Sequence, residues 1–239
     1  MMQLLADPQA WLAFLTLTAL ELVLGIDNVI FIAILVDKLP QARRGLARRL
    51  GLFLAMFMRV GLLFLLSVLV GLTEPILSVS SLRQDLSGRD LILIGGGLFL
   101  IWKSTREIHD LMAGDGHGPD ARDGRASFGS VLAQIVLIDI IFSLDSIITA
   151  VGLVDEIEIM IAAVVVSVAL MMAFSGAIAN FISPRPTIKM LALAFLFMIG
   201  LVLIADGLDH HVPKGYVYFA MAFSVLVEML NMRMRRKKA

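Results

Sequence analysis

Cysteine is absent from the 239 residues of the sequence, and only two tryptophans and two tyrosines occur in it. Without cysteine the chain forms no disulfide, no thiolate metal site and no cysteine nucleophile. Charged residues are also few, at 17% of the sequence, whereas 59% of the residues are hydrophobic. A soluble domain has only about 45–50% apolar residues. The composition therefore predicts an integral membrane protein.

Other familiar signals are missing as well. No Walker A motif occurs, so ATP is not expected to drive the protein directly. The N-terminus lacks the basic region and the small-residue cleavage site of a removed signal peptide, so we expect the first hydrophobic stretch to stay in the mature protein. Positive and negative side chains balance at 20 each. The basic cluster at residues 233–238 is expected to fix the topology and to contact anionic membrane lipid, and no nucleic acid is expected as a partner.

Long hydrophobic stretches make up most of the chain. A spanning helix needs about 20 mostly apolar residues. The stretches that qualify are residues 11–36, 49–72, 90–107, 128–153, 158–182, 187–206 and 215–232. We therefore expect an all-α fold, with one integral membrane domain over residues 1–239 built as a polytopic bundle of seven transmembrane helices. The longest connection, residues 112–126, is rich in Gly and Asp and is predicted to be a flexible cytoplasmic linker.

The basic residues predict the orientation. Sixteen of the 20 Lys and Arg residues lie in segments on one side of the predicted spans, while only Arg83, Arg89 and Lys214 lie on the other and Arg59 lies within the second span. Cytoplasmic loops carry the excess of Lys and Arg. We therefore expect an outside N-terminus and a cytoplasmic C-terminus.

Two of the stretches match each other. Residues 18–35 read TALELVLGIDNVIFIAIL, and residues 134–153 read QIVLIDIIFSLDSIITAVGL. Glu21 and Asp27 in the first stretch match Asp139 and Asp145 in the second, at the same spacing. A charge at the bilayer centre costs about 3 kcal/mol on insertion scales, so acids found there are candidates for a functional site.

The match predicts an inverted repeat. The first unit covers about residues 9–110 and the second about 128–208, while a seventh helix at about 215–232 and a basic tail at 233–239 lie outside. Three spans per unit is an odd number, so the second unit runs upside down, as in many transporters. Between the third and sixth spans the similarity is limited to LFLI at 98–101 and LFMI at 196–199.

Helix geometry leaves one question open. Six residues turn a regular helix by about 240°, so Glu21 and Asp27 do not share a face. Glu21, Gly25 and Asn28 do share one, and the matched residues of the second stretch behave in the same way. Either the second aspartate of each stretch faces a different neighbour, or each helix is locally unwound, as transporter helices that line a cavity often are.

The oxygen-bearing side chains suggest a metal. Carboxylate, amide and hydroxyl oxygens without thiolate suit Mn²⁺, Mg²⁺ or Ca²⁺. Carboxylates crowded together without a cation tend to stay protonated, so exchange of protons for the metal is one coupling that the sequence allows. The candidate metal ligands are Glu21, Asp27, Asn28, Asp139, Ser143, Asp145 and Ser146.

Two further charged residues are candidates for the transport pathway. Arg59 is expected to pair with a membrane acid, because an unpaired buried charge is strongly disfavoured. Its role is either a structural pairing or a mobile counter-ion that keeps the empty site neutral. Glu228 in the last span is either a relay for metal or protons or a hydrated acid near the cytoplasmic face. Residues 103–110 are expected to project into the cytoplasmic headgroup zone.

Four segments together resemble the TerC family of integral membrane proteins, named for tellurium resistance, especially its short members without CBS domains. They read ELVLGIDNVIFIAIL, DIIFSLDS, LILIGGGLFLIWKSTREIHD and LIADGLDHHVPKGYVYFAMAFSVLVEMLN. The resemblance implies a seven-helix bundle with inverted repeats and export of manganese across the bacterial inner membrane. The family's acidic motif positions correspond to Glu21, Asp27, Asn28, Asp139, Asp145 and Ser146.

The leading hypothesis is therefore a transporter, not an enzyme, that exports a divalent cation with Mn²⁺ as the first candidate. One alternative is an intramembrane enzyme that uses Asp27 and Asp145 as an acid/base pair. Its support is slight, because Gly25-Ile26-Asp27 only loosely resembles the Gly-x-Gly-Asp of membrane aspartyl proteases. The other alternative is a membrane scaffold without transport activity in stress or tellurite resistance. The oligomeric state is not predicted.

Overall fold

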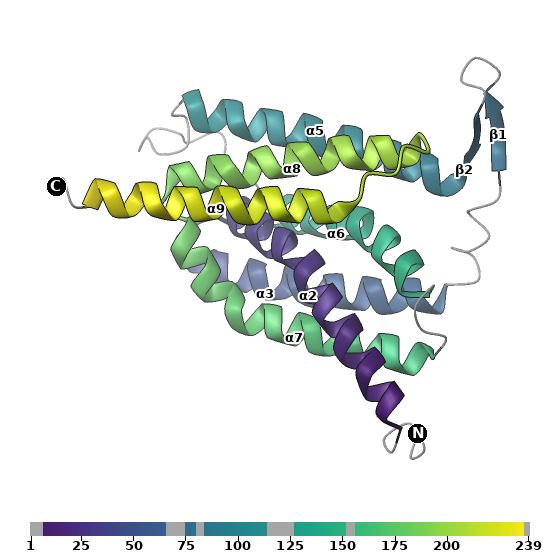
Figure 1. Ribbon diagram of the computed structural model, residues 1–239. Coiled ribbons are helices and arrows are strands. Elements are labelled where there is room, and N and C mark those ends of the chain that lie inside the picture. Colours follow the sequence, from purple (N-terminus) through teal and green to yellow (C-terminus); the bar gives the residue numbers. More distant parts are fainter. Residues whose placement is uncertain (1–6, 66–74, 80–83, 114–126, 152–155, 237–239) are drawn as a thin grey trace. The chain divides into compact units, whose positions relative to one another are not determined.

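The computed structural model describes residues 7–65, 75–79, 84–113, 127–151 and 156–236. These ranges are almost entirely helical (Figure 1). The elements are α2 (Pro8–Val36), α3 (Gln41–Phe64), β1 (Pro75–Val79), β2 (Gln84–Ser87), α5 (Gly88–Ala113), α6 (Phe128–Val151), α7 (Ile157–Ile182), α8 (Pro186–Gly207) and α9 (Lys214–Arg236). Each predicted span corresponds to one helix, so the predicted helical fold is confirmed.

The differences from the prediction lie at the ends of the elements. The helix α3 begins at Gln41 rather than at residue 49, because its basic first turns are compatible with a helix that leaves the bilayer. The predicted end of that span, at 66–72, lies outside the described residues. The helix α5 continues to Ala113, and most of the predicted linker, 114–126, also lies outside them. The short hairpin of β1 and β2 was not predicted.

Four of the described helices are long and apolar enough to cross a membrane: Pro8–Val36, Ile157–Ile182, Pro186–Gly207 and Gly215–Met234. In α6 the apolar segment Phe128–Ser143 is shorter. Large apolar side chains are exposed along α9, among them Tyr216, Phe219 and Phe223. Such a surface is stable in lipid but not in water. The chain is therefore a multi-pass membrane protein.

The helices group into two compact units. The first unit contains α2, α3, α6 and nearly all of α7, and the second contains α5, α8 and α9. The first unit thus combines the first two spans of each predicted repeat, and the second combines the third span of each with the last helix. Two of the matching pairs, α2 with α6 and α5 with α8, pack with each other.

In the second unit α5 and α8 pack backbone against backbone (Figure 1). A Cβ atom on Gly97 would lie 2.5 Å from the carbonyl oxygen of Gly200, and a Cβ on Gly200 would lie 2.9 Å from that of Gly97. Gly97 also faces Ile204, just as Gly200 faces Ile101. Small residues allow this approach. The contacts are reciprocal, as expected for two helices related by a local two-fold axis.

These contacts also correct the predicted register. They relate residues 97–101, GLFLI, to residues 200–204, GLVLI. The match of 98–101 with 196–199 is therefore wrong. Farther along the same interface, a Cβ on Gly207 would lie 2.8 Å from the carbonyl oxygen of Asp90. Residue numbers rise on α8 as they fall on α5, so the two helices are antiparallel, as inverted repeats require.

A buried ion pair lies in the second half of α5. The Lys103 Nζ atom lies 2.7 Å from Glu107 Oε1, and both side chains are almost fully buried. Ser104 between them is completely buried. This part of α5 was expected to project into the headgroup zone. Within the second unit the two charges are buried, because each compensates the other one turn away, and the expected depth in the membrane stays a prediction.

Candidate functional site

The first candidate helix is regular throughout. The side chain of Asp7 caps its N-terminus by accepting a hydrogen bond of 2.9 Å from the backbone N–H of Gln9, and Pro8 occupies the first turn, where its missing N–H costs nothing. From there α2 is an unbroken α-helix, and so is α6. Local unwinding at Gly25 or Ser143 is therefore not observed. The side chains of Asp27 and Asp145 lie outside the described part of the structure.

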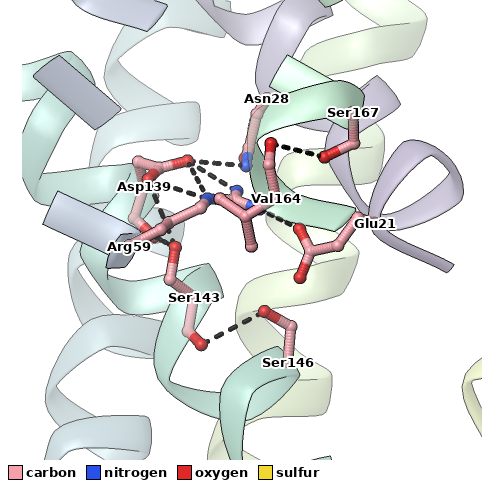
Figure 2. A network of polar contacts seen from close by, with 8 residues as sticks. All are labelled: Glu21, Asn28, Arg59, Asp139, Ser143, Ser146, Val164 and Ser167. Carbon is pink, nitrogen blue, oxygen red and sulfur yellow. Dashed lines mark hydrogen bonds and ion pairs between the residues drawn. The ribbon is translucent and has the colours of Figure 1, made fainter. Parts of the chain in front are cut away.

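A polar network lies between α2, α3 and α6 in the first unit (Figure 2). Its members are Glu21, Asn28, Arg59, Asp139, Ser143 and Ser146. All of them are at most 7% exposed. Five of the seven predicted metal ligands therefore lie in one buried network, together with the predicted arginine. Their assignment as metal ligands stays a prediction.

Small residues bring Arg59 into this network. Arg59 lies on the same face of α3 as the buried residues Ala47, Gly51 and Ala55, at intervals of four. A Cβ on Gly51 would lie 2.9 Å from the Ile135 side chain of α6. The close approach of α3 to α6 carries the arginine side chain to the carboxylates of α2 and α6.

Arg59 bridges two buried acids. Its Nη2 atom lies 2.6 Å from Asp139 Oδ1, and its Nε atom lies 3.2 Å from Oδ1 and 3.1 Å from Oδ2. Its Nη1 atom forms an ion pair with Glu21 Oε2. The planar fork of a guanidinium suits such bidentate contact. One positive and two negative side chains leave the group with one net negative charge when all are ionised.

Asp139 has other donors besides Arg59. Asn28 donates from Nδ2 to Asp139 Oδ1 at 3.2 Å. The Ser143 hydroxyl lies 2.5 Å from the backbone carbonyl of Asp139 and 3.2 Å from its Oδ2 atom. Ser146 donates to the carbonyl of Ser143 at 3.1 Å. The Oδ1 atom of Asp139 thus accepts from two residues, and its Oδ2 atom accepts from Arg59 and lies near the Ser143 hydroxyl.

Two side-chain oxygens on α2 differ from those of Asp139 in their hydrogen bonding. The Oδ1 atom of Asn28 and the Oγ1 atom of Thr18 are buried and have no hydrogen-bond partner among the described residues. The amide nitrogen of Asn28 must face the carboxylate, so its oxygen points away from Asp139. A buried polar atom without a partner costs about 1–3 kcal/mol. Thr18 was not predicted, although it lies three residues before Glu21 and so on the same helix face.

The helix α7 also lies against α2 beside the network, although no site residue was predicted on it. A Cβ on Gly25 would overlap the terminal methyl group of Met171, so this thioether lies against α2 between the levels of Glu21 and Asn28. Ser167, fully buried one turn before Met171, donates to the carbonyl of Val164 at 3.0 Å (Figure 2). Ser167 lies alone within an apolar run of α7, and such a run does not indicate from the sequence that the helix lies beside a polar network.

The described residues do not complete a metal site. No group of three or more His, Asp or Glu side chains among them is arranged to hold a metal ion. Glu228 belongs to the second unit, where it is half-buried on α9 and forms no hydrogen bond or ion pair with the described residues. Its role in the transport pathway stays a prediction.

Comparison with known proteins identifies the family. Residues 6–239 match the model of the integral membrane protein TerC family. The chain is 51% identical to a UPF0053 protein of Haemophilus influenzae, over 99% of both chains, and 53% identical to the UPF0053 inner membrane protein YgdQ of Escherichia coli K12, over 98% of this chain and 97% of that one.

A longer relative covers the same region. The chain is 48% identical to the UPF0053 inner membrane protein YoaE of Escherichia coli K12, over 98% of this chain but only 45% of the relative. No solved structure matches. The family model and the relatives span nearly the whole sequence, and the helices have the composition and lengths of membrane spans. The chain therefore belongs to the TerC family of integral membrane proteins.

Proposed function

We propose that this protein is a secondary transporter that exports a divalent metal cation, with Mn²⁺ as the first candidate, across the bacterial inner membrane. The observation that carries the proposal is the pair of buried carboxylates, Glu21 and Asp139, which come from matching positions of α2 and α6. Acids buried within membrane helices are expensive and are typical of ion pathways.

The chemistry of the donors supports a hard cation. Mn²⁺ prefers oxygen and nitrogen ligands, and the network offers carboxylate, amide and hydroxyl oxygens. Mg²⁺ and Ca²⁺ use the same donor types and are the competing candidates. The proposed ligands are Glu21, Asp27, Asn28, Asp139, Ser143, Asp145 and Ser146. Of these, Asn28 has a buried oxygen that lacks a hydrogen-bond partner among the described residues.

Proton antiport is the proposed driving force. The carboxylates that hold the metal on one side of the membrane would take up protons on the other, and this exchange keeps the buried charge small. The excess of Lys and Arg on one side of the spans supports a cytoplasmic C-terminus, from which the cation would be exported outward.

The test is Mn²⁺ flux in proteoliposomes that contain the wild type, Asp27→Asn or Asp145→Asn. We expect the flux of each variant to fall roughly ten-fold or more, since a loss of about 1.4 kcal/mol of binding free energy already lowers the affinity ten-fold. Glu158→Gln, which neutralises an exposed acid at the start of α7, is the matched control and should transport normally. Parallel assays with Mg²⁺ and Ca²⁺ identify the ion.

Two results would contradict the proposal at different levels. Undiminished flux in both aspartate variants removes those residues from the site. No flux of any of the three ions through the wild type, in vesicles with a proton gradient of either direction, removes the transport function itself.

A further inference from the structure

Arg59 lies between the two buried acids, where a metal cation would be expected. Its three nitrogen atoms bind Asp139 and Glu21, and its side chain is only 4% exposed. A guanidinium remains charged at all physiological pH values. The site is therefore already occupied by a cation that belongs to the chain.

The hydrogen bonds of Asp139 show how far this occupation extends. A carboxylate oxygen accepts about two hydrogen bonds. The Oδ1 atom accepts from Arg59 and Asn28, and the Oδ2 atom lies within hydrogen-bond distance of Arg59 and Ser143. A metal ion needs the same lone pairs. The Oδ1 atom of Asp139 cannot bind the metal while it accepts from both Arg59 and Asn28, so the metal has to displace one of them.

The neutral oxygens of the network show the opposite pattern. Each nitrogen of the Arg59 guanidinium contacts one of the two acids. Among the described residues, by contrast, Asn28 Oδ1 and Thr18 Oγ1 are buried without a hydrogen-bond partner, on the same face of α2 as Glu21. A guanidinium fork bound to two carboxylates does not reach these atoms. A metal ion, with its hydration water, is the kind of ligand that uses neutral oxygens together with carboxylates.

We propose that Arg59 is a tethered competitor of the transported cation. In the metal-free state its guanidinium compensates Glu21 and Asp139; the metal binds only after the guanidinium has left Asp139, and the return of the guanidinium assists release. The inference rests on the proposed transport function and adds to it the residue that weakens metal binding. It assigns to Arg59 a positioning and competing role rather than a purely structural one.

The two roles predict opposite effects on affinity. When only a fraction of the protein is competent to bind, the apparent affinity falls by that fraction. Removal of a competitor therefore strengthens metal binding, although the same change weakens the fold by leaving two acids unpaired. A structural arginine would instead leave metal binding unchanged or weaken it along with the fold.

The experiment is calorimetric titration of Mn²⁺ into the purified wild type, Arg59→Lys and Arg59→Gln, with Mg²⁺ as a comparison ion. We expect Arg59→Gln to bind Mn²⁺ roughly ten-fold or more tightly than the wild type. Arg59→Lys should lie between them, because an ammonium keeps the charge but lacks the bidentate fork. In proteoliposomes Arg59→Gln should nevertheless transport Mn²⁺ more slowly, because no guanidinium returns to the acids to assist release of the metal.

The matched control is Lys103→Gln. Lys103 is also a buried cation paired with an acid, Glu107, but in the second unit. Its Mn²⁺ affinity should equal that of the wild type. A gain in affinity of the same size in Lys103→Gln would overturn the competitor role, because the gain would then follow from the loss of any buried positive charge.

If Arg59→Gln does not fold, Arg59→Lys, which keeps the positive charge, still tests the competitor role. Mn²⁺ binding by the wild type together with equal or weaker binding by Arg59→Lys overturns the competitor role and leaves the transport proposal standing. An absence of Mn²⁺ binding in the wild type and in both variants overturns the transport proposal, and the competitor role with it. Graded tightening from wild type to lysine to glutamine supports both.

Discussion

At the scale of the residue, Asp139 connects three helices. It receives hydrogen bonds from Asn28 on α2, from Arg59 on α3 and from Ser143 in its own helix. The burial of Arg59 is tolerated because its charge is compensated, and Asp139 supplies most of that compensation. The aspartate is therefore expected to matter for stability as well as for metal binding.

Asp139→Asn should destabilise the metal-free protein. The change leaves the buried guanidinium with Glu21 as its sole acidic partner in the described network, and the removal of one partner of a buried ion pair costs up to about 3–5 kcal/mol. We expect the thermal unfolding midpoint, followed by circular dichroism in detergent, to fall on the order of 10 °C. Glu228→Gln should unfold like the wild type, because the described residues give Glu228 no partner. Equal midpoints for the two variants would contradict this account.

At the scale of the element, the pairing of α5 and α8 depends on glycine. Gly97 and Gly200 each lie against the backbone of the opposite helix, so even a methyl group has no room at either position. Apart from the backbone of its own helix, no atom of the described residues lies within 4 Å of a Cβ placed on Gly95 of α5. Two glycines two residues apart thus have different roles, which the run Gly95-Gly96-Gly97 does not show by itself.

Gly97→Ala should destabilise the second unit, because a Cβ 2.5 Å from the Gly200 carbonyl oxygen forces the two helices apart. Overpacking of this kind typically costs about 1–3 kcal/mol. Gly95→Ala is the control and should be neutral or stabilising by up to about 1 kcal/mol, since alanine favours the helix. Thermal unfolding of the two variants and the wild type provides the measurement. A Gly97→Ala protein as stable as Gly95→Ala would show that the interface is looser than the structure has it.

At the scale of the whole molecule, the orientation in the membrane depends on the distribution of charge. The described part of the chain contains seven helices of membrane-compatible length, and this odd number places the chain ends on opposite sides if each crosses once. The basic residues predict that the C-terminal side is cytoplasmic.

Single cysteines test this orientation without background, because the natural sequence has none. We expect a membrane-impermeant maleimide applied to intact spheroplasts to label Gln9→Cys and His210→Cys, which lie in exposed positions on the predicted outer side. Ser127→Cys and Thr187→Cys should be labelled only after the membrane is opened. Their labelling in intact spheroplasts, with Gln9→Cys and His210→Cys protected, would reverse the predicted orientation.

Much of this protein could be inferred from the sequence alone. Long apolar runs determine the helices, because every backbone polar group must be satisfied inside lipid, and a helix does this within one segment. The repeated acids also marked the two helices that contribute Glu21 and Asp139 to the network. The residues that the sequence did not indicate, Thr18 and Met171, carry no charge, and their positions matter only through what packs against them.

The tertiary structure decided the remaining questions. Whether α2 and α6 are broken, which register relates α5 to α8, and which acids Arg59 contacts all depend on side chains far apart in the sequence. Local composition carries no information on such pairings, since many neighbours would satisfy the same charge or fill the same space. The sequence by itself determined a membrane protein with costly acids in two helices. Only the packing of α3 against α6 decided that an arginine lies between those acids.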